Sequence, residues 1–210
     1  MSTRVLRLAA VLSAPIGLAV LAAIHPIVSE RLVPDDQLGV WTLIHTLQLP
    51  LAALLGVAVL LLIEGLDGTE ARAARLAVVP WAVAFAAYDA IAGLAAGAMS
   101  AYGHQHPAEA DTVMAIAVSV ADSVLVSTVL PLTAFAFAFP LFGGAALALH
   151  RAGAGGFAAF AIAASGVTWT FIHPLVGAPA MALFLIGAVL AERSRASRPV
   201  PSPVIGRLSA

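Results

Sequence analysis

The sequence lacks both cysteine and lysine, and only 10% of its 210 residues are charged. Without cysteine the chain forms no disulfide, no thiolate metal site and no iron–sulfur cluster. Without lysine it forms no retinal Schiff base, which excludes a rhodopsin. The net charge of −1 and the absence of a basic run give no indication of a nucleic-acid partner. No Gly-rich phosphate loop, HExxH motif or catalytic nucleophile motif is present, so the sequence leaves open whether the protein is an enzyme.

Apolar residues dominate the composition. They make up 61% of the chain, and the mean hydropathy is +1.01. Soluble domains have about 45–50% apolar and about 25% charged residues. Several apolar runs exceed the roughly 18 residues that indicate a membrane-spanning helix. The sequence therefore predicts an all-α, polytopic membrane protein whose main environment is the lipid bilayer.

Five apolar tracts are separated by short polar connections. They cover approximately Leu8 to Val28, Leu38 to Ile63, Leu76 to Met99, Thr112 to Leu149 and Gly156 to Ala191. The first resembles a signal peptide but has no convincing cleavage site, so we expect an uncleaved first span. Residues 1–192 are predicted to form the transmembrane bundle. Residues 193–210 are polar and rich in Pro and Ser, and are predicted to form a disordered cytoplasmic tail.

Arginine distribution predicts the orientation. Arginines precede the first and third tracts, follow the fourth and fill the tail, whereas the 29–37 and 100–111 connections hold mainly acidic residues. Because basic loops stay in the cytoplasm, both termini are predicted to lie inside, in a six-helix bundle of the cytoplasmic membrane. Five spans are the alternative.

The two longest tracts decide the number of spans. We expect Thr112 to Leu149 to be one long span bent at Pro131 and Pro140. Gly156 to Ala191 is predicted to be a hairpin of two spans that turns at "HPLVGAP", where Pro174, Gly177 and Pro179 are helix breakers. In the rival arrangement the fourth tract divides at its prolines and the last tract is a single tilted helix.

The predicted topology places most histidines at the outer side. His25, His45 and His173 come from three different tracts and are predicted to share one depth, with His104 and His106 in the loop above them. Only His150 is expected at the cytoplasmic face. A buried imidazole needs a partner, so the simplest interpretation of each is a hydrogen bond between helices. Their convergence, however, predicts a shared site.

Acidic residues within the tracts indicate the same region. Asp89 and Asp122 are each about ten residues from the outer end of a span, so both are expected near mid-membrane and facing the bundle interior. Helical spacing places Gln48 on the face of His45 and of Trp41, and Ser123 adjoins Asp122. The predicted outcome is an outward-opening polar cavity walled by Trp41 and Trp169. Gly93 and Gly97 have the small-xxx-small spacing of a helix-packing face.

Three classes of function fit this pattern. The first is a membrane redox protein that holds haem b or a divalent metal (Cu or Zn) through His25, His45 and His173, with a quinone or a redox protein as partner. His104 and His106 are a further candidate metal pair. The second is a permease for a small solute, proton or metal ion that uses Asp89 and Asp122 as coupling groups. The third is a non-catalytic assembly subunit, and a homo-oligomer is compatible with each.

Overall fold

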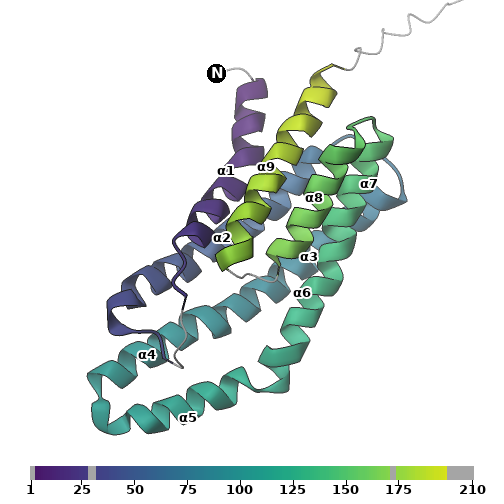
Figure 1. Ribbon diagram of the computed structural model, residues 1–210. Helices are drawn as coiled ribbons and strands as arrows, with labels where there is room; N and C mark the ends of the chain where they lie inside the picture. Colours follow the sequence, from purple (N-terminus) through teal and green to yellow (C-terminus); the bar gives the residue numbers. More distant parts are fainter. Residues whose placement is uncertain (1–2, 28–31, 171–173, 198–210) are drawn as a thin grey trace, which may run out of the picture.

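The computed structural model describes residues 3–27, 32–170 and 174–197, and in these ranges every regular element is helical. Five helical runs are long and apolar enough to cross a membrane (Figure 1). They cover Arg4–Ala23, Asp35–Leu62, Thr69–Gln105, Leu125–Arg151 and Val176–Ala196. The chain therefore has the architecture of a multi-pass membrane protein, as its composition predicts.

The helices follow the order of the apolar tracts. The α-helices are α1 (Thr3–Ala23), α2 (Leu38–Leu62), α3 (Thr69–Asp89), α4 (Ala96–Gln105), α5 (Ala110–Ala121), α6 (Leu130–Ala138), α7 (Gly144–Arg151), α8 (Gly156–Trp169) and α9 (Pro174–Ala196). Three π-helical segments join some of them: η2 (Ala90–Ala95), η4 (Leu125–Val129) and η5 (Phe139–Gly143). Two 3₁₀ turns, η1 (Asp35–Gln37) and η3 (Pro107–Glu109), precede α2 and α5.

The third tract forms the longest helical run, because α3, η2 and α4 continue into one another over 37 residues. At 1.5 Å per residue this run is about 55 Å long, well beyond a hydrocarbon core of about 30 Å. After a turn at η3, α5 runs back along α4, and the two form a hairpin at the lower end of the view (Figure 1).

The fourth tract is not the single span predicted from sequence, because it breaks at Asp122 rather than bending at Pro131 and Pro140. Ser123 explains the break. Its hydroxyl donates to the carbonyl of Val120 at 2.6 Å and lies 3.4 Å from the backbone nitrogen of Val126, which it caps. The prolines instead lie within the continuous run Leu125–Arg151, where π-helical turns accommodate the missing amide.

The last tract folds back on itself, with α8 packed along α9. The turn, however, precedes the predicted one: α8 ends at Trp169 and α9 begins at Pro174. Proline suits the first helical turn, where its missing N–H needs no partner. Gly177 and Pro179 lie inside α9. Gly177 packs against α1, where a Cβ would lie 3.0 Å from that of Ala22.

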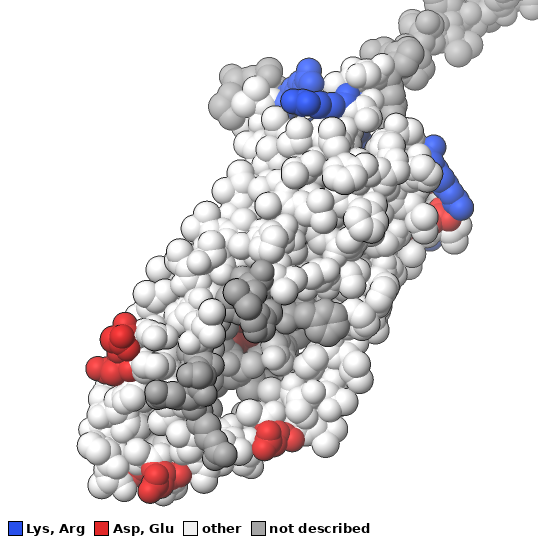
Figure 2. Space-filling view, viewed as in Figure 1, with Lys and Arg blue, Asp and Glu red and all other residues white. Residues whose placement is uncertain are grey.

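The ends assigned to the cytoplasm by the arginine pattern gather at one end of the molecule. Arg7 of α1 forms ion pairs with Glu64, which follows α2, and with Glu192 of α9. At the same end Arg151 of α7 pairs with Glu70 of α3. Figure 2 shows the arginines at the end where α1 begins and α9 finishes, and acidic side chains at the opposite end.

Candidate functional site

A buried contact between two ionisable side chains joins α2 to the end of α3. The Nδ1 atom of His45 lies 2.7 Å from the Oδ1 atom of Asp89, and the side chains are 8% and 3% exposed. Beside an ionised Asp89, which only accepts hydrogen bonds, Nδ1 of His45 is the donor. A neutral His45 then has its lone pair on Nε2.

The π-helical segment η2 begins directly after Asp89 and packs against the ring of His45. The ring of His45 lies against Gly93, and a Cβ at Gly93 would be 2.2 Å from Nδ1. The indole Nε1 of Trp41 donates to the carbonyl oxygen of Gly93 at 2.8 Å, and Trp41 packs over Gly97. The small-residue face predicted from the sequence thus receives two aromatic rings of α2 rather than a helix backbone.

His25 joins this group from the segment after α1. Its ring contacts that of His45 edge to face, with the centroids 5.3 Å apart, and that of Trp41 at 5.2 Å. Its Nδ1 donates to the carbonyl oxygen of Pro26 at 2.8 Å. Trp41 and His45 are themselves 4.5 Å apart. Three rings from two segments therefore pack together beside the His45–Asp89 hydrogen bond.

Three buried polar atoms of this region have no hydrogen-bond partner within the described residues: His45 Nε2, Asp89 Oδ2 and Gln48 Oε1. Gln48 is 1% exposed and lies three residues beyond His45 on the same face of α2. Buried polar atoms normally have partners, and unpaired ones indicate a catalytic or binding role or bound water. This group of His45, Asp89 and Gln48, with His25 and Trp41 packed against it, is the candidate site.

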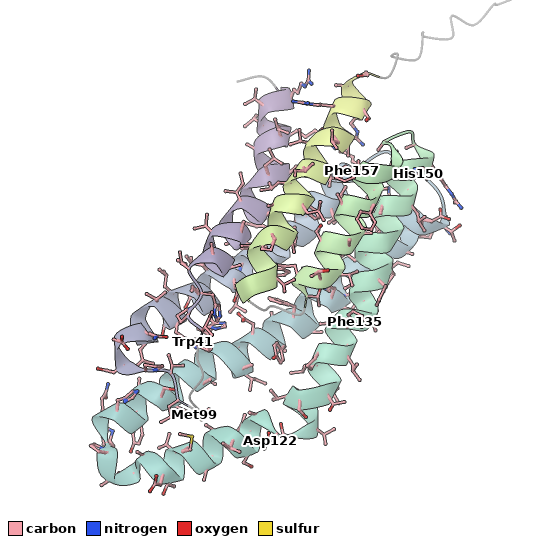
Figure 3. The ribbon with its side chains drawn as sticks, in the orientation of Figure 1. Trp41, Met99, Asp122, Phe135, His150 and Phe157 are labelled. Carbon is pink, nitrogen blue, oxygen red and sulfur yellow. The ribbon has the colours of Figure 1, made fainter. Side chains whose placement is uncertain are left out.

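Asp122 and Ser123 do not join the candidate site. Asp122 is exposed, at the turn between α5 and η4, away from Trp41 (Figure 3). The expectation that it faces the bundle interior is wrong, because the helix ends there and Ser123 uses its hydroxyl to cap the next segment. Asp89, by contrast, is 2% exposed and lies in the interior as expected.

Trp169 belongs to the apolar core rather than to a cavity wall. It is fully buried, with its ring 4.9 Å from Phe85 and 6.3 Å from Trp81. Ser165, one turn before it, bonds only to carbonyls of its own helix. The position of Trp169 follows from the packing of α8 against α3 and η5, which the sequence does not reveal.

The remaining histidines have separate environments. His104 lies 2.9 Å from the carbonyl oxygen of Val33, and His106 stacks on Tyr102. His173 lies outside the described residues. Within those residues, no group of three or more His, Asp or Glu side chains is arranged to hold a metal ion.

Sequence reasoning missed the direct bond between His45 and Asp89. It placed them in neighbouring spans but at different depths, with His45 near the outer face and Asp89 near mid-membrane. One available signal was the four-residue spacing of Asp89, Gly93 and Gly97, which puts the carboxylate on the same face as the two close-packing glycines.

No protein-family model matches the chain, and no curated protein or solved structure is significantly similar to it.

Proposed function

We propose that the protein is a proton-coupled permease of the cytoplasmic membrane in which the His45–Asp89 pair binds the proton. The observation that carries this proposal is the 2.7 Å bond between two ionisable groups that are almost completely buried. Ionisable residues inside a membrane bundle are costly, and in pumps and transporters they form proton relays. The pair can take up a proton at Nε2 of His45 while Asp89 balances the new charge.

Protonation of His45 changes which hydrogen bonds its Nε2 atom can form. A neutral His45 accepts at Nε2, whereas a protonated one donates there, so any group facing Nε2 must change its role. Gln48 carries both a donor and an acceptor, and it lies on the same face of α2. Protonation also turns the His45–Asp89 hydrogen bond between α2 and α3 into a contact between opposite charges, and a contact that differs between two states biases one conformation over another.

We further propose six crossings with both termini in the cytoplasm, counting α8 and α9 as a paired hairpin. The positive-inside distribution of arginine supports this orientation. From Thr69 to Asp89, α3 has 21 residues and is about 30 Å long. The His45–Asp89 pair would then lie near the outer boundary of the hydrocarbon core, with the α4–α5 hairpin beyond it.

Trp41 provides a direct test, because its ring is 4.5 Å from that of His45 and an imidazolium quenches indole fluorescence. Because the ring of His25 also lies 5.2 Å from that of Trp41, the fluorescence is measured in His25→Gln protein in lipid nanodiscs, where we expect it to titrate with pH. In this background His45→Gln and Trp41→Phe should each remove the titration, whereas His150→Gln should leave it intact, since His150 is at the end of α7.

A transport measurement completes the test. A pH jump applied to proteoliposomes on a capacitive sensor should produce a transient charge displacement in the wild type but not in His45→Gln. A fluorescence titration that survives His45→Gln in the His25→Gln background, or a wild type without charge displacement, would count against the proposal.

Binding of one metal ion is a second candidate, because His25 and His45 both donate Nδ1–H to an oxygen. Metal-bound histidines are usually anchored in this way. A haem between the two rings has less support, since rings in edge-to-face contact leave no slot for a porphyrin. Elemental analysis and the visible spectrum of the purified protein would identify a metal or haem. A redox-active metal or a haem would imply that a quinone or a redox protein is the partner.

A further inference from the structure

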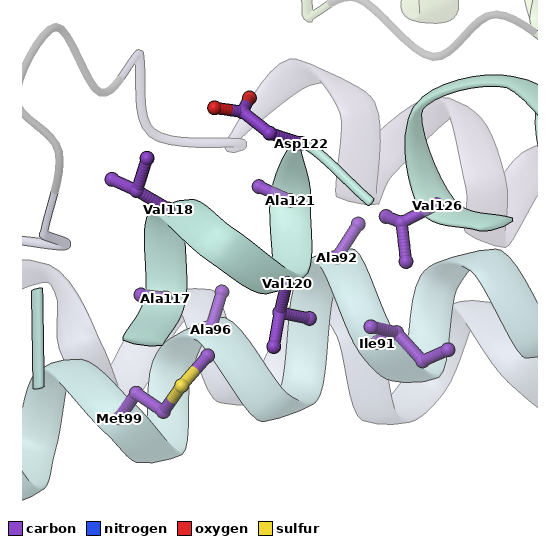
Figure 4. A pocket seen from close by; sticks show the side chains of 10 residues that line it. All are labelled: Ile91, Ala92, Ala96, Met99, Ala117, Val118, Val120, Ala121, Asp122 and Val126. Carbon is purple, nitrogen blue, oxygen red and sulfur yellow. The ribbon is translucent and has the colours of Figure 1, made fainter. Parts of the chain in front are cut away.

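A cavity lies on a different face of the long third helix from the candidate site. It has a volume of about 420 Å³ and lies between η2–α4 on one side and α5–η4 on the other. Its lining consists of nine apolar side chains and one carboxylate: Ile91, Ala92, Ala96, Met99, Ala117, Val118, Val120, Ala121, Val126 and Asp122. Figure 4 shows the apolar side chains gathered between the two helical segments, with Asp122 at the edge of the set.

Small residues create this cavity. Ala92 and Ala96 line one wall and Ala117 and Ala121 the other, and their short side chains leave space between the two helical segments. The volume falls within the roughly 300–1,000 Å³ of small-molecule sites. The π-helical turn of η2 contributes to both sites, because Gly93 contacts His45 while Ile91 and Ala92 face the cavity.

Asp122 gives the cavity its charge. Its carboxylate has no hydrogen bond or ion pair with any described part of the chain, whereas the exposed acid Glu109 bonds Tyr102. No arginine lines the cavity. A single carboxylate at the rim of an apolar cavity is complementary to a ligand with one positive charge and an apolar body.

We infer that this cavity binds a small organic cation with apolar substituents, its charge beside Asp122 and its apolar part among the alanines and valines. The cavity is lined by residues other than His45 and Asp89, so the inference goes beyond the proposed proton site. An acyl chain would fill the apolar part equally well, but it would gain nothing from the carboxylate.

The test uses benzyltrimethylammonium and its neutral isostere neopentylbenzene, which differ in charge but hardly in shape. Binding of each radiolabelled compound is measured by equilibrium dialysis against the protein in nanodiscs, with empty nanodiscs subtracted. We expect saturable binding of the cation. Asp122→Asn should weaken it about two- to fivefold, the effect of removing one exposed charge partner. Asp111→Asn, on the same helix but outside the cavity, should have no effect.

Ala117→Leu provides an independent variant, since a larger side chain there occupies the cavity without altering its charge. It should weaken binding of both compounds. If cation and isostere bind equally and Asp122→Asn changes neither, the cavity is an acyl-chain groove and the inference is wrong. Absence of saturable binding also overturns it. His45→Gln separates the two proposals, because in the His25→Gln background it removes the pH-dependent fluorescence of Trp41 but leaves Asp122 and the cavity lining in place.

Discussion

At the scale of single residues, the candidate site depends on the absence of a side chain at Gly93. The ring of His45 occupies the space that a Cβ would fill, at 2.2 Å from Nδ1. The same glycine offers its carbonyl oxygen to Trp41. One position on η2 therefore fixes two rings of α2, and through His45 it sets the geometry of the bond to Asp89.

Gly93→Ala should displace His45 and break its bond to Asp89. Overpacking of this kind costs about 1–3 kcal/mol, so we expect a lower thermal unfolding temperature in detergent and, in the His25→Gln background, a loss of the pH-dependent fluorescence of Trp41. Gly143→Ala is the matched control, because a Cβ there meets nothing within 4 Å. Equal effects of the two substitutions would contradict this role of Gly93.

At the scale of helical elements, Ser123 determines where the fourth tract breaks. Its hydroxyl bonds to Val120 at the end of α5 and accepts from the amide of Val126 in η4. Without the hydroxyl, each of these backbone groups keeps only its bond to the backbone of Ser123.

Ser123→Ala should lower the free energy of unfolding by about 0.5–2 kcal/mol, the usual cost of removing such a cap. Ser119→Ala is the control, because Ser119 is exposed in the middle of α5. Thermal unfolding of both variants in the same detergent checks the prediction. A Ser123→Ala protein as stable as the wild type would show that packing alone holds the break.

At the scale of the whole molecule, ion pairs tie together the elements at one end of the bundle. Arg7 reaches Glu64 and Glu192, so α1, the end of α2 and α9 are joined there. Salt bridges at a surface contribute about 0–1 kcal/mol each. The two pairs also hold the start of α1, the end of α2 and the end of α9 together.

The orientation can be tested with single cysteines, because the native sequence has none. In intact cells or right-side-out vesicles, a membrane-impermeant maleimide should label a cysteine at position 104 but not one at position 151. Labelling of both positions after permeabilisation is the control for reactivity. The reverse pattern would mean that both termini lie outside.

The long-range features of the fold were harder to anticipate than the helices themselves. Apolar tracts predict where helices occur, because any backbone in lipid must satisfy its own hydrogen bonds. They do not predict that Trp169 packs on Phe85, since this contact depends on how neighbouring helices meet. Lipid is as apolar as leucine, so hydropathy gives little information about which faces meet.

The sequence by itself determined that this is an α-helical, multi-pass membrane protein, and it indicated His45 and Asp89 as unusual residues for such a setting. Composition suffices for these conclusions, because burying charge in lipid is costly at any position. Only the tertiary structure decided that the two side chains bond to each other. That contact requires Gly93 to admit the imidazole ring. It depends on how α2 packs against α3 and η2, and the spacing of Asp89, Gly93 and Gly97 marks one face of the third helix without identifying the helix that meets it.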